Sequence, residues 1–167
     1  MKVLIVFGFH EKFEGETKAR FEKAERLAFS FDKVIFTGRE WKKVKKTNPD
    51  PVWLLKNVEG EFESTTTLEN LKFSFNKLPE TESQVFLLST WYHLPRIAID
   101  CLFLRPPSKT RFIPVWYLNK TVLIGFLLAE PMGIIFDVLY LISARKIHRG
   151  WQRLKKYLCQ RLAKYFL

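Results

Sequence analysis

Short apolar runs alternate with helix-type segments along most of the chain, and this alternation limits the fold more than any other feature. The apolar runs have the length of β-strands and occupy residues 3–9, 33–37, 58–63, 85–89 and 111–117. Helical periodicity or helix-start signals mark residues 16–31, 67–77 and 95–104. The pattern predicts an α/β fold: a Rossmann-like, open, mostly parallel sheet of about five strands with helices on both faces.

Charge divides the chain into two parts. The net charge is +11, but residues 138–167 contain no Asp or Glu. The positive charges of this segment are Arg145, Lys146, Arg149, Arg153, Lys155, Lys156, Arg161 and Lys164. We therefore expect an α/β domain of residues 1–143 and a basic C-terminal helix of residues 144–167.

The basic segment has an amphipathic pattern. Apolar side chains recur at steps of three and four, at Ile147, Trp151, Leu154, Leu158, Leu162 and Tyr165. One apolar stripe among basic faces is typical of a helix that docks on its domain, or of one that lies on an anionic membrane surface through residues 145–167. Nucleic-acid binding is not favoured, because neither a groove-reading fold nor a stacking platform is evident.

Residues 121–142 form an apolar stretch of 22 residues, which is long enough to span a bilayer. Glu130 and Asp137 lie inside it, and each carboxylate in mid-membrane costs about 2.5–3.5 kcal/mol on insertion scales. We expect a core helix or a membrane-dipping segment that turns both carboxylates towards the ligand site.

The start of the chain and the cysteines bear on location. The first apolar run leads into the charged stretch "HEKFEGETK" without a cleavage signal, so we expect no targeting peptide. Cys101 and Cys159 are far apart and have no ligand-type neighbour, which predicts reduced thiols rather than a disulfide or a zinc site. We expect a cytoplasmic protein, either free or peripheral at the inner face of the membrane.

Polar residues cluster where the predicted strands end. Gly8 and His10 follow the first strand, and Thr37 and Gly38 close the second. "ESTTTLEN" (residues 63–70) follows the third strand, and "STWYHLPR" (residues 89–96) follows the fourth. Ligands of parallel α/β sheets bind beyond the carboxyl ends of the strands, so these residues predict one shared site.

The two motifs at this spacing resemble the SanA/YdcF/ElyC-like family, a bacterial domain of unknown function also called the "218" domain. The matching positions are Glu63, Ser64, Thr67, Glu69, Asn70, Ser89, Thr90, Tyr92, His93 and Arg96, together with Arg20 and Glu130. The resemblance covers about residues 3–140, and the single glycine of "TGREWKK" departs from it. It implies a role in the cell envelope and adds Arg20 and Glu130 to the candidate ligand-binding residues.

His93 and Glu63 are the candidate catalytic residues. Histidine is suited to proton transfer near neutral pH, so His93 could be a general acid or base; the alternative is a histidine that packs over a helix start. Arg96 lies one turn from His93 and could grip phosphate or carboxylate with two hydrogen bonds. The alternative for Arg96 is an internal ion pair with Glu69 or Glu130.

The remaining motif residues allow simpler interpretations. Thr67 is expected to be the N-cap of its helix, and Glu69 could act through the helix dipole alone. Asn70 could bind a ligand or join two loops. Scattered carboxylates leave a hydrated magnesium open, but no ligand spacing supports a metal site. No G-x-S-x-G supports a catalytic triad, and neither nucleotide-binding glycine motif is present, so the residues identify no cofactor.

Two function classes follow from these residues and the resemblance. One is an enzyme, a hydrolase or transferase, that acts on a phosphorylated or lipid-linked anionic substrate. The other is a non-catalytic module that binds a nucleotide-like or anionic small molecule.

Overall fold

The computed structural model of the chain describes residues 1–8, 14–39, 41, 55, 57–78, 83–104, 106, 109–118 and 130–139. The chain divides into two compact units, Met1–Tyr117 and Leu118–Leu167. The predicted boundary at residue 143, the basic helix of residues 144–167 and His10 lie outside the described residues.

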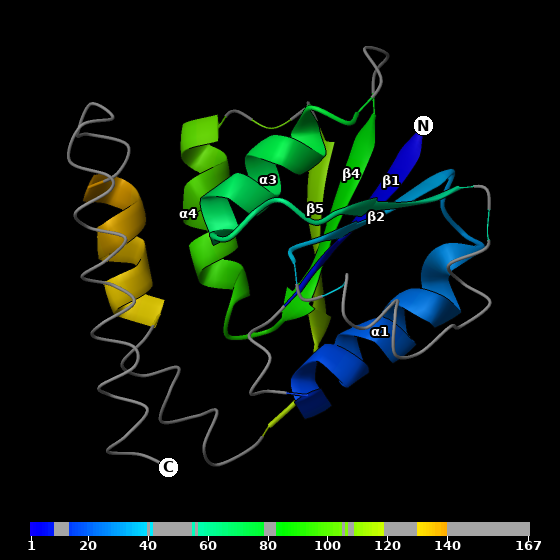
Figure 1. The fold of residues 1–167 in the computed structure, drawn as a ribbon, viewed down its shortest axis with the longest axis horizontal. Helices are drawn as coiled ribbons and strands as arrows, with labels where there is room; N and C mark the ends of the chain where they lie inside the picture. Colours follow the sequence, from blue (N-terminus) through cyan, green and yellow to red (C-terminus); the bar gives the residue numbers. More distant parts are fainter. Residues whose placement is uncertain are drawn as a thin grey trace. The chain divides into compact units, whose positions relative to one another are not determined.

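The first unit is built on a sheet of five parallel strands in its described part (Figure 1). The strands are β1 (Lys2–Phe7), β2 (Lys33–Thr37), β3 (Val58–Glu61), β4 (Gln84–Thr90) and β5 (Lys109–Val115). The helices between them are α1 (Glu14–Ala28), α3 (Thr67–Phe75) and α4 (Leu94–Leu104). The predicted Rossmann-like α/β class is confirmed, and every described strand pair is parallel.

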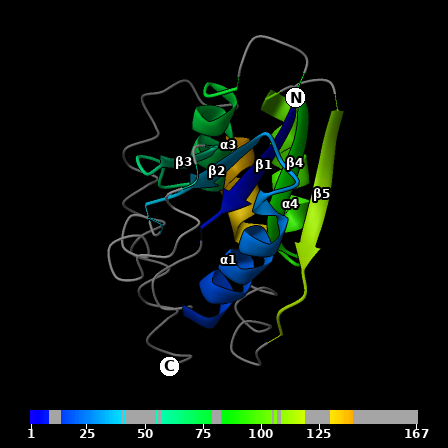
Figure 2. The ribbon, with the colours of Figure 1, turned by 90° about the vertical axis from the view of Figure 1, so that its right-hand side faces the viewer.

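The strand order β3-β2-β1-β4-β5 places β1 at the centre. The chain moves outward from β1 through β2 to β3, and then returns across β1 to β4 and β5. Right-handed crossovers therefore put α1 on one face and both α3 and α4 on the other, as Figures 1 and 2 show. The direction changes between β1 and β4, and such a switch point is where open α/β sheets bind ligands.

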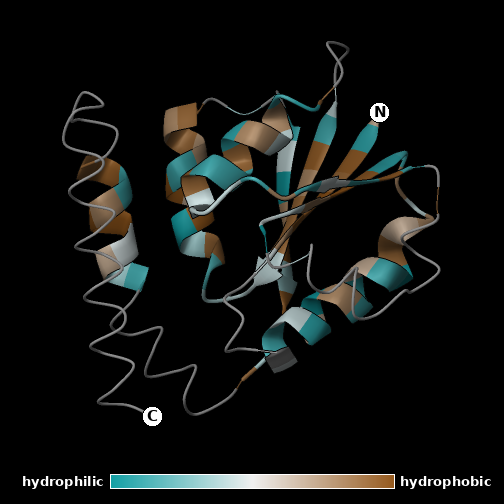
Figure 3. Cartoon of the chain, viewed as in Figure 1, coloured by the Kyte–Doolittle hydropathy of each residue, from teal (hydrophilic) through white to brown (hydrophobic). Residues whose placement is uncertain are grey.

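Alternating side chains of the strands build two cores. Leu4 and Val6 of β1 pack with Phe21 and Ala24 of α1. The other face of the sheet contributes Val3, Ile5, Phe7, Val85 and Leu87, which pack with Leu71 of α3 and Ile97 of α4. Burial on both faces explains why the strands read as continuous apolar runs, and Figure 3 shows these runs along the centre of the sheet.

An ion pair at the edge strand β3 makes stability depend on pH. Glu59 lies 2.8 Å from Lys33 Nζ and also contacts Lys77 Nζ. Burial disfavours the Glu59 carboxylate, but hydrogen bonds and charges from the two lysines outweigh it and lower its pKa below the usual 4.5. A lowered pKa adds stability above the unfolded-state value, and this stability is lost as pH falls through the folded-state value.

We expect Glu59→Gln to reduce the free energy of unfolding at pH 7 by about 0.5 kcal/mol, because the pair is partly exposed and screened by solvent. The difference should shrink below pH 4.5 and vanish in more acidic buffer. Urea unfolding at several pH values checks this, with Glu25→Gln on the exposed side of α1 as the control. A difference that persists in acid would contradict the ion-pair account.

Candidate functional site

Arg20 joins the carboxyl ends of the two central strands. This residue of α1 is fully buried. Its NH1 donates to the carbonyl oxygens of Phe7 (3.1 Å) and Gly8 (2.9 Å) at the end of β1. Its NH2 donates to Thr90 Oγ1 (2.6 Å) at the end of β4 and to Glu16 Oε1 (2.7 Å). Arg20 thus spans the switch point on the α1 face.

Glu16, Thr90 and Tyr92 complete this network. Thr90 Oγ1 donates to Glu16 Oε1 at 2.7 Å. Burial and the nearby Glu16 carboxylate raise the pKa of Tyr92, so its hydroxyl stays protonated. Arg20, Thr90 and Tyr92 were predicted to bind a ligand; in the structure Arg20 and Thr90 donate hydrogen bonds to neighbouring protein groups. Sequence reasoning missed Glu16; its signal was the spacing of four residues from Arg20 on one helix face.

A second network joins the ends of β2 and β3. Glu61 Oε1 accepts from the backbone N–H groups of Glu63 (2.8 Å) and Ser64 (3.0 Å). Glu61 Oε2 accepts from the hydroxyls of Thr37 (2.7 Å) and Ser64. The same two hydroxyls contact Asn70 Oδ1, at 3.2 Å for Thr37. Ser64 and Asn70, both predicted site residues, therefore join the loop after β3 to β2.

The buried carboxylate at the end of β3 is Glu61, whereas the side chain of Glu63 is exposed. The sequence interpretation carried this strand to residue 63, but Glu61 is its last residue and pairs with Thr37, the last residue of β2. Shortening the strand by two residues moves the carboxylate at its end from Glu63 to Glu61. Glu63 remains a candidate only as an exposed residue at the rim.

Thr66, rather than Thr67, is the N-cap of α3, so the predicted cap was wrong by one residue. Thr66 has extended backbone, and its Oγ1 accepts from Glu69 N–H at 3.1 Å. The Glu69 carboxylate in turn accepts from the N–H (2.9 Å) and hydroxyl (2.8 Å) of Thr65. Glu69 is three residues after Thr66, and this capping-box spacing selects Thr66 from three successive threonines.

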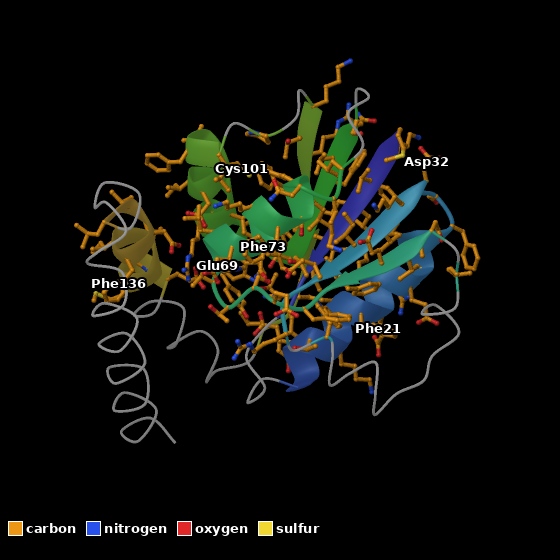
Figure 4. The ribbon with its side chains drawn as sticks, turned by 45° about the horizontal axis from the view of Figure 1, so that its top comes forward. Phe21, Asp32, Glu69, Phe73, Cys101 and Phe136 are labelled. Carbon is orange, nitrogen blue, oxygen red and sulfur yellow. The ribbon has the colours of Figure 1, made fainter. Side chains whose placement is uncertain are left out.

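The shifted cap leaves Thr67 as the first residue of α3, with a buried side chain. Figure 4 shows Glu69 at this end of the helix, while Cys101 of α4 lies towards the opposite end of the sheet. The start of α3 therefore belongs to the same edge as the carboxyl ends of the strands.

His93 meets Thr67 at this edge. Thr67 Oγ1 and His93 Nε2 lie 3.5 Å apart, and both side chains are buried. His93 immediately precedes α4, and its ring lies edge-on to Phe7 with 6.3 Å between centroids. The starts of α3 and α4 thus converge over the end of β1, on the face opposite α1.

Ser89 brings a buried hydroxyl to the same face. It lies two residues beyond Leu87, which packs in the core shared with α3 and α4, so strand alternation points Ser89 to that side. It also follows Leu88, the partner of Val6 in β1. The Ser89 side chain is fully buried, and its hydroxyl has no hydrogen-bond partner in the described part of the chain.

Buried polar residues continue along α4. Arg96 lies one turn after His93, and Asp100 is fully buried one turn further on. Sequence reasoning identified Arg96 but missed Asp100, whose signal was its position four residues after Arg96 on the buried face. Burial and the adjacent Asp100 raise the pKa of the Cys101 thiol to about 12, so this cysteine is kept protonated.

Backbone groups and aromatic rings complete the edge. Gly8 N–H donates to Thr37 O and Gly38 N–H donates to Glu61 O, both at 2.8 Å, which extends the ladder past the strands. Gly38 has φ of 113°, a left-handed conformation that favours glycine. Trp91 stacks on the exposed Trp116 with 5.9 Å between centroids.

Glu130 belongs to the second unit, and its part in the site stays a prediction.

Within the described residues, no group of three His, Cys, Asp or Glu side chains is arranged to hold a metal ion. No helix in the described segments combines the length and apolarity that crossing a bilayer requires.

Comparison with known proteins adds no relative. No family model, no curated protein and no solved structure matches the chain. The resemblance of residues 63–70 and 89–96 to the SanA/YdcF/ElyC-like family therefore stays a prediction.

The Arg20 network gives a direct stability test. Glu16→Ala removes the carboxylate that lies 2.7 Å from Arg20 NH2, and so takes an ion-pair partner from a fully buried charge. Breaking a buried pair in this way costs about 3–5 kcal/mol. We expect a loss of this size in urea unfolding.

Two further variants control for simple cavity formation. Glu16→Gln keeps a hydrogen-bond acceptor and should cost less than Glu16→Ala. Glu16→Ala combined with Arg20→Met should recover part of the loss, because the uncompensated charge is gone. A cost of Glu16→Ala below about 1 kcal/mol would contradict a buried ion pair that holds β1 and β4 together.

Proposed function

We propose that the protein is an enzyme that acts on a phosphorylated or lipid-linked anionic substrate, held at the carboxyl edge between the starts of α3 and α4. One observation carries the proposal: His93 Nε2 lies 3.5 Å from Thr67 Oγ1 where the two helices begin, and strand alternation turns the buried Ser89 hydroxyl at the end of β4 to the same face of the sheet. A proton-transfer group, a hydroxyl and two helix N-termini share one location.

The helix starts favour a negatively charged ligand. The first N–H groups of a helix have no acceptor within it, and the aligned peptide dipoles place partial positive charge there. Helices α3 and α4 add these effects at Thr67 and Leu94. Arg96, buried in the first turn of α4, adds a formal positive charge. Phosphate and carboxylate groups fit such a location.

His93 is the residue we assign to proton transfer. Its ring is held between Phe7 and Thr67, so its orientation is fixed before a substrate arrives. Thr67 and Ser89 would donate hydrogen bonds to the anion. Glu16 and Glu61 serve as framework, because each already accepts hydrogen bonds from neighbouring protein groups.

The resemblance to the SanA/YdcF/ElyC-like family supplies the biological side of the proposal. It suggests cell-envelope metabolism and, with it, a lipid-linked substrate. An anionic membrane surface, contacted through residues 145–167 on the cytoplasmic side, would bring the protein to such a substrate.

The second candidate is a non-catalytic module for a nucleotide-like or anionic small molecule. The module is favoured because the two buried carboxylates at this edge, Glu16 and Glu61, already accept hydrogen bonds from protein groups. His93 is then the main candidate for proton transfer, without a carboxylate assigned to work beside it. The module and the enzyme use the same site and differ in turnover.

Turnover against a panel of phosphomonoesters, phosphodiesters and lipid diphosphates tests the proposal. We expect the wild type to cleave at least one class, and His93→Gln to lower kcat/KM by about 10²–10⁴-fold because general acid–base catalysis is lost. Ser89→Ala should raise KM by about tenfold through a lost hydrogen bond. Ser74→Ala, which removes another fully buried hydroxyl from α3, is the matched control and should change neither constant.

Each failure has a distinct meaning. Binding of inorganic phosphate that needs Ser89, without turnover of any ester, would favour the module. Turnover that survives His93→Gln unchanged would place the chemistry elsewhere.

A further inference from the structure

The helix formed by residues 130–139 has its polar and apolar sides reversed relative to a helix in water (Figure 1, yellow to orange). Its buried residues are Glu130, Gly133 and Asp137. Its exposed large side chains are all apolar: Met132 (41% exposed), Ile135 (50%) and Leu139 (39%). The two sets have matching spacings of three and four residues and fall on opposite sides of the helix.

This arrangement is unfavourable for a helix whose outer side meets only water. Surface helices bury their apolar stripe and expose their charges. Here both carboxylates are buried, which demands compensating contacts, and every exposed or partly exposed residue of the helix is uncharged. The exposed side of the described helix therefore has no side chain that could form an ion pair or a hydrogen bond with water.

We propose that the 130–139 helix rests on an anionic lipid surface, with Met132 and Ile135 in the boundary between headgroups and acyl chains. Charge complementarity selects lipid as the occupant. Residues 138–167, which continue from this helix, contain eight Lys and Arg residues and no Asp or Glu. Apolar side chains next to a cluster of positive charge are the combination that binds anionic membranes.

The burial pattern sets the orientation of the described segment. With Glu130 and Asp137 turned inward, the exposed Met132, Ile135 and Leu139 are the side chains that face the lipid. This contact differs from the one expected of residues 145–167, and it does not depend on whether the site at His93 is catalytic.

Vesicle cosedimentation of the full chain tests the proposal. The probes are vesicles of phosphatidylcholine mixed with phosphatidylglycerol, and vesicles of phosphatidylcholine alone. We expect the wild type to bind the anionic vesicles, and Met132→Ser combined with Ile135→Ser to lower the partition coefficient by about tenfold. The loss should persist at high salt, because salt screens charge but not apolar contact.

Two variants serve as controls. Met132→Leu with Ile135→Leu keeps the apolar side and should bind like the wild type. Phe29→Ser removes an apolar side chain that is 83% exposed at the end of α1 and should also leave binding unchanged. Thermal melting checks folding, and Ile135→Ser alone replaces the double variant if that variant fails to fold.

Three results would overturn the proposal. The first is a wild type that stays in solution beside anionic vesicles. The second is a folded serine variant that binds them as tightly as the wild type. The third is wild-type self-association in analytical ultracentrifugation that the serine variant abolishes without any loss of lipid binding, which would assign the helix face to a second copy of the chain.

Discussion

The buried guanidinium of Arg20 is the interaction on which the arrangement of this protein depends. It sits at the switch point of the sheet and bonds the last carbonyls of β1, the last hydroxyl of β4 and the Glu16 carboxylate. A charge fully removed from water is tolerated only when its partners are well placed. Arg20 therefore fixes β1, β4 and α1 relative to one another.

The same interaction fills the switch point on one face of the sheet. On the α1 face the switch point is occupied by protein groups: Arg20, Glu16 and Thr90. On the other face the strands end beneath the starts of α3 and α4, where Thr67 and His93 meet. The Glu61 network and the Thr66 cap hold the start of α3 in place. The candidate site thus lies on the α3 and α4 side because the α1 side is already filled.

The fold class was predictable because burial on both faces turns each strand into a continuous apolar run. Most of the predicted site residues lie at one edge of the sheet because they follow the ends of parallel strands, whose positions the apolar runs indicate. Their individual roles were not predictable. The contact between Arg20 and Thr90 joins residues 70 positions apart, and the pairing of Thr37 with Glu61 depends on a strand register that no local pattern encodes.

Short-range errors had a different cause. Three successive threonines each satisfy the rule for an N-cap, and only the position of Glu69 separates Thr66 from Thr67. The helix at residues 130–139 was predicted in part. The sequence analysis expected Glu130 and Asp137 to turn inward, and both are buried. It did not predict that Met132, Ile135 and Leu139 would form an exposed apolar side.

Amide chemical shifts during a titration with inorganic pyrophosphate test the central claim most directly. If the anion binds where α3 and α4 begin, the largest shifts should fall on the amides of Thr67, Leu68, His93 and Leu94. Ser89→Ala should weaken the response, and Ser74→Ala should not. Shifts confined to the basic residues beyond 144, or an absence of saturable shifts at both helix starts, would contradict an anion site at this edge.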